Sequence, residues 1–389
     1  MMIFSKRMEL FKSGIFSELA EMRDNKIKEG MRVIDLSVGT PNIPPAKHLI
    51  DKMVSETSNP KNYVYSISDI KELREAASKW YKRRYNVTLN PETEIVSLCG
   101  SQEGLTHIAL ALVDEGDTVL VPDPCYPAFA DGPKIAGAEL YYMPQKAEND
   151  YVINLNDIPE AVAVKAKYML VSYPNNPTTA IAPDSFYHEL IKFAKKYNII
   201  VIHDNAYSEL VFDGKKGKSF LSFDGAIDVG VEFNSLSKTY GLAGARIGFC
   251  VGNNEVIEKL TCLKSNMDYG MFLPIQKTAI AAITGDQSCV YENMKTYEHR
   301  RDKLCDGLNS IGWITEKSQA TMFVWTSLPN GYSDSVSFCR ELLDKAGVLV
   351  TPGSAFGPSG EGYVRMALVR TDEEIDYAVS QIKRSEILK

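Results

Sequence analysis

Hydrophobic and polar positions follow two alternating periods through the middle of the chain. Short runs rich in β-branched and aromatic residues indicate strands at 94–98, 118–122, 168–173, 199–204, 229–233 and 246–251. Stretches with the helical period lie between them, as after Gly100, where Leu105, Ile108 and Leu112 share one face, and at 186–197. Strands that alternate with helices predict an α/β fold with a mostly parallel central sheet flanked by helices.

The pattern changes near residue 286. A long, charged helical stretch at 287–310 is typical of a connector between domains. Beyond it, strands are expected at 321–326, 348–351 and 362–368, with helices at 333–346 and at the chain end. This order predicts a smaller α+β domain. Because 389 residues exceed one ordinary core, we expect three parts, namely 1–45 (N-terminal arm and start of the small domain), 46–285 (large domain) and 286–389 (connecting helix and C-terminal small domain).

Composition narrows the functional class. A net charge of −7 argues against a broad surface for nucleic acid. No window offers the roughly 18 consecutive apolar residues of a membrane-spanning helix, and charges interrupt the first thirty residues where a secretory signal would be apolar. The seven cysteines form no Cys-x-x-Cys pair, and the five histidines are scattered. We therefore expect a cytoplasmic protein without disulfides and without a metal site.

The strongest chemical signal is a lysine segment that follows the strand at 229–233. Lys238 stands next to Ser237 and close to Ser235, and Arg246 follows eight positions later. A desolvated lysine beside another cation loses its proton more easily, and the neutral amine can attack a carbonyl to form a Schiff base. Hydroxyl groups and an arginine suit a phosphate. The segment therefore indicates an aldehyde cofactor that carries a phosphate.

Two further strand ends each allow two interpretations. The turn at 100–104 begins a helix, whose free N–H groups attract phosphate, or it places Ser101 as an ordinary cap with Glu103 in the first turn. Asp204 ends an apolar strand. It is a turn former, or it is a carboxylate that faces a protonated ring nitrogen, with Tyr207 offering a phenol to the same ligand.

Three more residues carry similar alternatives. Asn176, in Tyr-Pro-Asn-Asn-Pro-Thr at 173–178, belongs to a turn or donates to a ligand at a strand end. Tyr126 packs in the core or stacks on an aromatic ring. Arg365 lies inside an apolar strand and needs an anionic partner, which is an internal acid or a substrate carboxylate.

The chain resembles the class I/II aminotransferases, which are pyridoxal-phosphate enzymes of fold type I. The resemblance rests on five motifs in a fixed order, namely Gly-Ser-Gln-Glu-Gly, Pro-Asn-Asn-Pro-Thr, Asp-Asn-Ala-Tyr, Ser-Leu-Ser-Lys-Thr-Tyr and the late arginine. The resemblance runs from about residue 35 to the C-terminus. It implies that residues 46–285 form the large domain that binds pyridoxal 5′-phosphate. Segments 80–85 and 264–270 are similar to the subgroup of alanine and LL-diaminopimelate transaminases.

The resemblance also implies residue roles. Lys238 would form the Schiff base with the cofactor and carry the proton, and Asp204 would hold the ring nitrogen. Tyr207 and Asn176 would bind the ring's 3′-oxygen, with Tyr126 stacked on one face. Ala206 would pack on the other face of the ring. The residues implied for the phosphate are Ser101, Gln102, Ser235, Ser237 and Arg246. Those implied for the substrate's α-carboxylate are Gly39, Asn176 and Arg365.

The implied reaction moves an amino group between an L-amino acid and a 2-oxo acid by a ping-pong mechanism, with alanine/glutamate or LL-diaminopimelate type substrates. The family also forms homodimers in which one subunit lends a tyrosine to its partner's phosphate. Here Asp69 stands where that motif usually has glycine, and an ungapped match places Val64 at the tyrosine position. Tyr65 is the expected residue with a one-residue gap, and Tyr63 is the alternative. Thr179 replaces a glycine common after Asn-Pro-Thr.

Two other functions use similar sequences. A C–S lyase would use the same carbanion to expel a group from the β-carbon. A transcription regulator with an aminotransferase-like domain would carry an N-terminal DNA-binding module, whereas about 30 residues precede the matching region of this acidic chain. Within the transaminase interpretation, Asp268 and Tyr269 either line the partner's substrate pocket or are ordinary loop residues.

Overall fold

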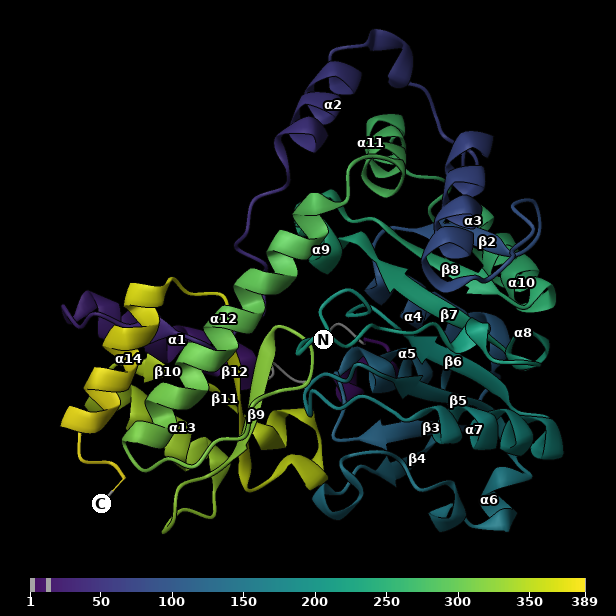
Figure 1. The fold of residues 1–389 in the computed structure, drawn as a ribbon. Helices are drawn as coiled ribbons and strands as arrows, with labels where there is room; N and C mark the ends of the chain where they lie inside the picture. The colour runs from purple at the N-terminus through teal and green to yellow at the C-terminus, as the bar shows by residue number, and fades with distance from the viewer. Residues whose placement is uncertain (1–3, 12–14, 389) are drawn as a thin grey trace.

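The central feature of the computed structural model, which describes residues 4–11 and 15–388, is a seven-stranded sheet in the order β2-β8-β7-β6-β5-β3-β4 (Figure 1). Its strands are β2 (Ile95–Leu98), β3 (Thr118–Asp123), β4 (Glu139–Pro144), β5 (Ala166–Ser172), β6 (Ile200–Asp204), β7 (Gly230–Ser235) and β8 (Gly248–Gly252). Only β8 runs against its neighbours. The mostly parallel sheet is therefore confirmed, and each predicted sheet strand is present within two residues of its expected ends.

Both faces of the sheet are covered by helices, because its strands are apolar on both sides. Val119 and Val121 pack with helices α4 (Ser101–Leu112), α5 (Ala128–Ala136) and α10 (Asn254–Met267). Leu120 points to the opposite face, where α3 (Lys71–Tyr85), α7 (Asp184–Tyr197) and α11 (Leu273–Thr284) lie. Helix α2 (Lys47–Thr57) packs on α11. The short helices of this part are α6 (Glu160–Ala163), α8 (Ala226–Val229) and α9 (Leu236–Thr239).

A second group of elements follows α12 (Ser288–Ser310). This helix runs from the region of α9 to the C-terminal elements (Figure 1). Strands β11 (Thr351–Pro352), β12 (Tyr363–Ala367) and β9 (Phe323–Ser327) form an antiparallel sheet in that order. A separate pair joins β1 (Ile34–Asp35) to β10 (Val348–Leu349). Helices α13 (Ser335–Ala346), α14 (Asp372–Arg384) and α1 (Ile15–Lys28) complete this part.

Two expectations for the C-terminal part were wrong in detail. The single strand expected at 348–351 is divided, because β10 pairs with β1 whereas β11 pairs with β12. The strand expected from residue 321 begins at Phe323, since Thr321 has a φ of 72°, which no extended strand residue adopts. The β1–β10 pair also brings the first part of the chain against the C-terminal part.

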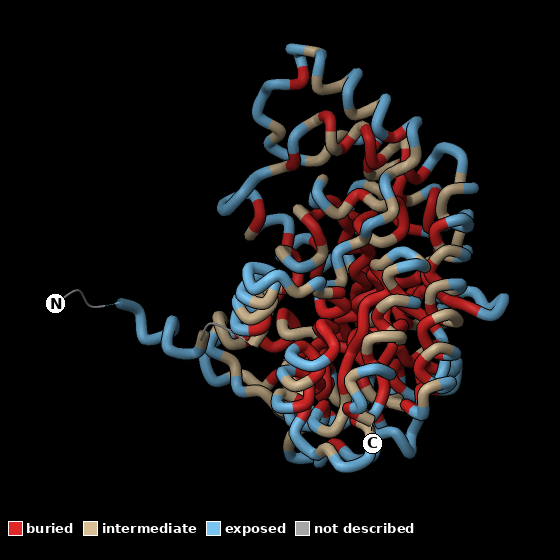
Figure 2. Tube along the Cα trace, turned by 90° about the vertical axis from the view of Figure 1, so that its left-hand side faces the viewer, coloured by how far each residue is buried: buried red, intermediate tan, exposed pale blue. Residues whose placement is uncertain are grey.

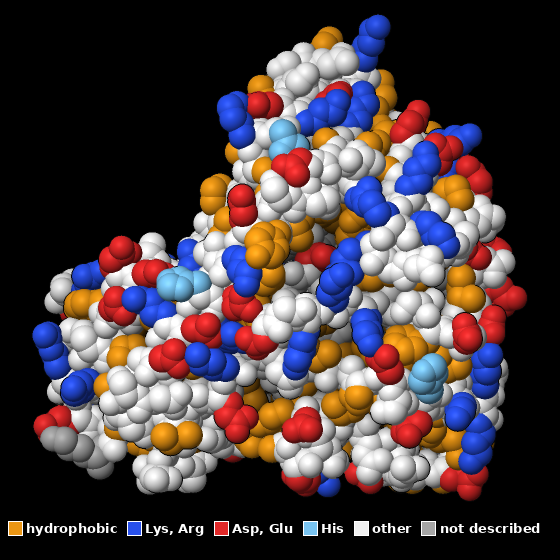
Figure 3. All heavy atoms as spheres, viewed as in Figure 1, with side chains coloured by type: hydrophobic (Ala, Val, Ile, Leu, Met, Phe, Trp, Pro, Cys, Tyr) orange, Lys and Arg blue, Asp and Glu red, His pale blue; other side chains and the backbone are white. Residues whose placement is uncertain are grey.

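The distribution of buried residues follows the packing of helices on the sheet. Buried residues fill the interior between sheet and helices, while the 3₁₀ helix η1 (Lys6–Leu10) projects from the body and is exposed (Figure 2). Acidic and basic side chains intermingle on the face seen in Figure 3. No helix among the described residues has the length and apolarity that crossing a membrane requires. All seven cysteines fall within the described ranges, and each has a free thiol.

Candidate active site

The sheet brings the predicted site residues to one edge. β2, β5, β6 and β7 share a direction, so Ser101, Asn176, Asp204 and the lysine segment all follow carboxyl ends at that edge. β8 runs the other way, so Arg246, which precedes it, reaches the same edge. Ligands of open α/β sheets bind in the crevice outside the carboxyl ends of the strands.

A cavity of about 470 Å³ opens at this edge. Apart from Tyr65, every residue expected to bind cofactor or substrate lines it, namely Gly39, Ser101, Gln102, Tyr126, Asn176, Asp204, Ala206, Tyr207, Ser235, Ser237, Lys238, Arg246 and Arg365. Residues far apart in the sequence therefore surround one space large enough for a cofactor and a small substrate.

One corner of the cavity is suited to an anion. The helix α4 begins at Ser101 with Gly100 as its cap, and no side chain of the described residues caps its first N–H groups. The interpretation of Ser101 as a cap is therefore wrong. The guanidinium of Arg246 lies against this turn, because a Cβ at Gly100 would stand 2.3 Å from Arg246 Nη2. Ser235 and Ser237, which also line the cavity, can add hydroxyl donors. Free helix N–H groups and an arginine together form a phosphate site.

Asp204 lines the cavity with one unsatisfied carboxylate oxygen. Its side chain is at the end of β6, the residue is 6% exposed, and Oδ1 has no hydrogen-bond partner in the described part of the chain. Burial, with a smaller contribution from the charge of Glu232, raises the pKa of this carboxyl group to about 7. A buried carboxylate oxygen without a donor is costly unless a ligand supplies one. The protonated ring nitrogen of pyridoxal phosphate is such a donor.

Lys238 projects into the cavity from α9. Its Nζ donates a hydrogen bond of 3.1 Å to the carbonyl oxygen of Gly39. Burial and the nearby guanidinium groups of Arg365 and Arg246 lower the pKa of the Lys238 ammonium to about 8. At neutral pH roughly a tenth of the amine is therefore neutral, far more than for an exposed lysine. This environment suits an amine that attacks an aldehyde.

Arg365 is held on β12, and no acidic partner for it is found in residues 4–11 and 15–388. The residue is 5% exposed, and its guanidinium donates to Asn176 Oδ1 and to the carbonyl oxygen of Ser37, both at 2.8 Å. Its Nε has no partner among the described residues. The alternative of an internal acid is wrong, because every observed acceptor is neutral. Burial lowers the pKa of Arg365 to about 10. A buried cation with only neutral acceptors is a site for a substrate anion.

The remaining aromatic residues form the walls. Tyr126 donates a 3.0 Å hydrogen bond to Gln102 Oε1, which places its ring over the cavity mouth beside α4. Tyr207 is buried next to Asp204, and its ring lies edge-on to Phe323 at 5.9 Å. Burial raises the pKa of both phenols, so both are neutral donors at neutral pH.

Phe323 and Phe356 were missed by sequence reasoning. Their rings lie 4.0 and 4.6 Å from the guanidinium carbon of Arg365 and hold it between them. Phe323 also leaves no room for a side chain at Gly39, where a Cβ would be 2.4 Å from the ring. In the sequence they were ordinary apolar residues of the C-terminal part, and no motif pointed to the site.

Tyr65 is not brought to the cavity of its own chain. Its side chain is 89% exposed, and Tyr63 instead donates to the carbonyl oxygen of Thr57 and packs edge-on against Phe272. Asp69, at the usual glycine place, accepts two hydrogen bonds from Ser97. Neither tyrosine therefore contributes to the cavity of its own subunit.

Two loop residues noted from the sequence also lie outside this cavity. Asp268 pairs with Lys264, and Tyr269 is exposed. Thr179 keeps a left-handed backbone with a φ of 63°, the conformation that a glycine would favour. Thr179 therefore adopts the backbone conformation expected of the glycine that it replaces.

Comparisons with known proteins show the family of this chain. The family model "Aminotransferase class I and II" matches residues 31–382. An LL-diaminopimelate aminotransferase of Moorella thermoacetica is 45% identical over 95% of this chain and 94% of its own length. One from Dehalococcoides mccartyi is 42% identical over 98% of both chains. A substrate-bound BacF structure from Bacillus subtilis has a TM-score of 0.95 with 36% identity, covering 99% of this chain and 98% of that one.

A second structural neighbour, a probable N-succinyldiaminopimelate aminotransferase from Thermus thermophilus, has a TM-score of 0.90 and 33% identity over 95% of this chain and all of that one. The unpaired carboxylate oxygen of Asp204, the uncapped start of α4 beside Arg246 and the amine of Lys238 fit pyridoxal phosphate at three separate groups. The chain belongs to the class I and II aminotransferase family and is a pyridoxal-phosphate-dependent transaminase.

Proposed function

We propose that this cavity transfers an amino group from LL-diaminopimelate to a 2-oxo acid. The observation that carries the site assignment is the pair of buried cations. Lys238 has a lowered pKa, and Arg365 has only neutral acceptors. A group that binds the α-carboxylate thus shares the cavity with a group that can move the α-proton. The names of the relatives support this donor over alanine or glutamate.

Pyridoxal phosphate would be held by three groups of residues. The start of α4 with Ser235, Ser237 and Arg246 would bind its phosphate, and Asp204 would accept from its ring nitrogen. Tyr207 and Asn176 would donate to the ring oxygen, with Tyr126, Gln102 and Ala206 among the walls. When bound, the cofactor supplies an aldehyde that condenses with amines and a protonated ring that accepts an electron pair.

The protein's own groups then position and move the proton. Arg365 and Asn176 fix the substrate's α-carboxylate, which limits how the α-carbon can turn. Lys238 removes the α-proton as a neutral amine and delivers it again as an ammonium group. Arg365 binds the carboxylate of the amino donor and later that of the 2-oxo acid. One site therefore serves both half-reactions, as a ping-pong mechanism requires.

We also propose that the enzyme is a homodimer with a shared site, and that it works in the reducing cytoplasm. Tyr65 and its neighbours Val64 and Ile67 are exposed apolar side chains on one segment, and Phe4 and Met8 are exposed on the N-terminal arm. Exposed apolar residues that cluster in this way are typical of an interface. In the dimer, Tyr65 would reach the partner's phosphate, with Tyr63 as the alternative.

A mixing experiment tests the shared site. Lys238→Ala and Tyr65→Ala proteins, each inactive or weak alone, are combined under conditions that exchange subunits. Recovery of activity in the mixture supports a site built from two subunits. A monomer by sedimentation equilibrium, or no recovery although subunits exchange, would refute it.

A half-reaction screen tests the proposed donor. The enzyme is mixed with LL-diaminopimelate, alanine or glutamate while conversion of the cofactor to its aminated form is followed by absorbance. Meso-diaminopimelate is the matched control, because it differs only at one chiral centre. We expect the highest kcat/KM with the LL isomer. Preference for alanine or glutamate would refute this donor, and release of pyruvate from a cysteine conjugate without a 2-oxo acid would favour a C–S lyase.

A further inference from the structure

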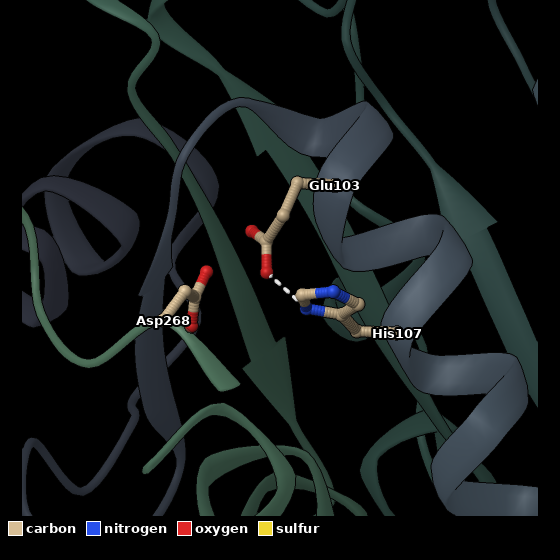
Figure 4. A group of neighbouring side chains, drawn as sticks. All are labelled: Glu103, His107 and Asp268. Carbon is tan, nitrogen blue, oxygen red and sulfur yellow. Dashed lines mark ion pairs between the residues drawn. The ribbon is translucent and has the colours of Figure 1, made fainter. Parts of the chain in front are cut away.

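A buried lysine lies behind the phosphate corner of the cavity. Lys264, in the last turn of α10, is surrounded by the carboxylates of Glu103 and Asp268. Its Nζ is 2.9 Å from Glu103 Oε1 and 3.0 Å from Asp268 Oδ2, and its side chain is 7% exposed. Figure 4 shows Glu103 and His107 on α4 turned toward Asp268 on the loop after α10.

Glu103, His107 and Asp268 lie close enough together to hold a metal ion, since their ligand atoms are within 4.8 Å of one another. However, the ammonium of Lys264 is already within hydrogen-bond distance of both carboxylates. A metal ion would have to displace this cation. Lys264 therefore already compensates part of the negative charge of this cluster from within the protein.

Lys264 is protonated at neutral pH. Burial alone would lower the pKa of the ammonium, but hydrogen bonds and charge attraction from Glu103 and Asp268 raise it above its usual value. Removing the lysine would leave two carboxylates facing each other, with the imidazole of His107 beside them. Like charges at this distance repel, so Glu103 would turn away from its present position.

The position of Glu103 matters because it also holds the phosphate-binding turn. Its second oxygen accepts a 3.1 Å hydrogen bond from the backbone N–H of Cys99. Cys99 precedes Gly100, whose φ of 84° and close approach to Arg246 leave the turn little freedom. A shift of Glu103 would therefore move the N–H groups at the start of α4 relative to Arg246.

We propose that Lys264 is a positioning residue for the cofactor's phosphate, acting through Glu103 on the turn from Cys99 to Ser101. This inference rests on the proposed cofactor site. It predicts that Lys264 contributes to the binding of the phosphate group and little to the binding of the ring and aldehyde.

The test compares two ligands that differ only in the phosphate. Enzyme freed of cofactor by conversion to the aminated form and dialysis is titrated with pyridoxal 5′-phosphate and with pyridoxal. In Lys264→Met, we expect the dissociation constant for pyridoxal phosphate to rise about tenfold, equivalent to about 1.4 kcal/mol, while that for pyridoxal is unchanged. Lys264→Arg should restore most of the affinity, because it keeps the cation.

Two variants serve as controls. Lys259→Met removes an exposed lysine of the same helix whose ion pair, within the described ranges, is with Glu258, and it should bind both ligands as the native protein does. Asp268→Asn keeps the Lys264–Glu103 pair and should have a smaller effect than Lys264→Met. Titrations are done well below the lowest melting temperature of the set.

Three results would overturn the inference. The first is an unchanged preference for the phosphate in Lys264→Met, and the second is an equal loss of affinity for both ligands. The third is an Asp268→Asn effect as large as that of Lys264→Met, because the action would then not run through Glu103. A native protein that binds neither ligand would instead refute the proposed cofactor site, and this inference with it.

Discussion

Replacing Arg365 by methionine should separate the stability of this protein from its function. The guanidinium makes two hydrogen bonds to neutral oxygens and lies between Phe323 and Phe356. Its Nε is unused within the described structure. The side chain thus keeps N–H groups available for a carboxylate, and methionine would fill much of the same space without them.

The expected loss of activity can be estimated from these bonds. A carboxylate held by two N–H groups gains two charge-assisted hydrogen bonds of about 1.5–3 kcal/mol each. Two of the N–H groups already donate to Asn176 and Ser37, so we take the lower value for each new bond. Two bonds of about 1.5 kcal/mol then contribute about 3 kcal/mol to substrate binding. This corresponds to a decrease of roughly 10²-fold in kcat/KM. Arg365→Lys keeps the charge but loses the planar fork, so its loss should be intermediate.

The fold should tolerate the same change. Burial of Arg365 without an acidic partner lowers the pKa of its guanidinium to about 10, which means that the charged form is disfavoured in the folded protein. Replacing buried charge with an apolar group of similar volume is often neutral or stabilising, by up to about 4 kcal/mol. That gain offsets the two lost hydrogen bonds. We therefore expect the melting temperature of the cofactor-free variant to stay level or rise.

The assay is the half-reaction with alanine, glutamate and LL-diaminopimelate, combined with thermal unfolding followed by circular dichroism. The α-carboxylate is common to all three donors, so kcat/KM should fall by a similar factor for each. Arg340→Met, which removes an exposed arginine of α13, is the matched control and should change neither quantity. A loss confined to one donor would show that Arg365 recognises a side chain, and a large decrease in melting temperature would show a structural role.

Four further predictions concern the cofactor. Lys238→Ala should abolish turnover and the visible absorbance of the attached cofactor, and a variant that keeps both would contradict the assignment of Lys238. Because the pKa of Lys238 is lowered to about 8, attachment of pyridoxal phosphate to the cofactor-free protein should accelerate as pH rises toward 8 and level off above it; a plateau reached only above 10 would refute the lowered pKa. Asp204→Ala should weaken cofactor retention and slow proton removal, measured by deuterium exchange at the substrate α-carbon, whereas full activity would contradict the role of its carboxylate. Gly100→Ala should weaken binding of pyridoxal phosphate more than that of pyridoxal, because its Cβ would displace Arg246; equal titration curves for native and variant protein would exclude that contact.

Local pattern was sufficient for most of the central sheet and its helices. The strands at 118–123 and 200–204 are apolar on both faces, and such runs between amphipathic helices have few other solutions than a buried parallel sheet. Strand β4 escaped prediction because it is an edge strand whose residues are mostly exposed or half-buried. The division of residues 348–352 into two strands depends on partners at Ile34 and Arg365, and no local pattern records a change of partner.

The candidate site was predictable where a motif carries it. Asp204 ends one strand of the mostly parallel sheet, and Asn176 and Lys238 follow two others, so the sequence order alone places them at a common edge. What could not be predicted is the state of charge of each group. That state depends on whether a side chain finds a partner, which is a property of the folded chain.

Arg365 and Lys264 show the difference between two buried cations. Both basic side chains are buried, but the sequence suggested an acidic partner or a ligand only for Arg365 and offered no interpretation of Lys264 by itself. In the fold, Lys264 meets two carboxylates and its pKa rises, whereas Arg365 meets neutral oxygens and two aromatic rings and its pKa falls. A cation whose charge is compensated holds structure in place, and one that is not compensated favours binding of an anion. Arg365 is therefore the cation that a substrate carboxylate would meet, and Lys264 is the cation that we propose orders the phosphate turn.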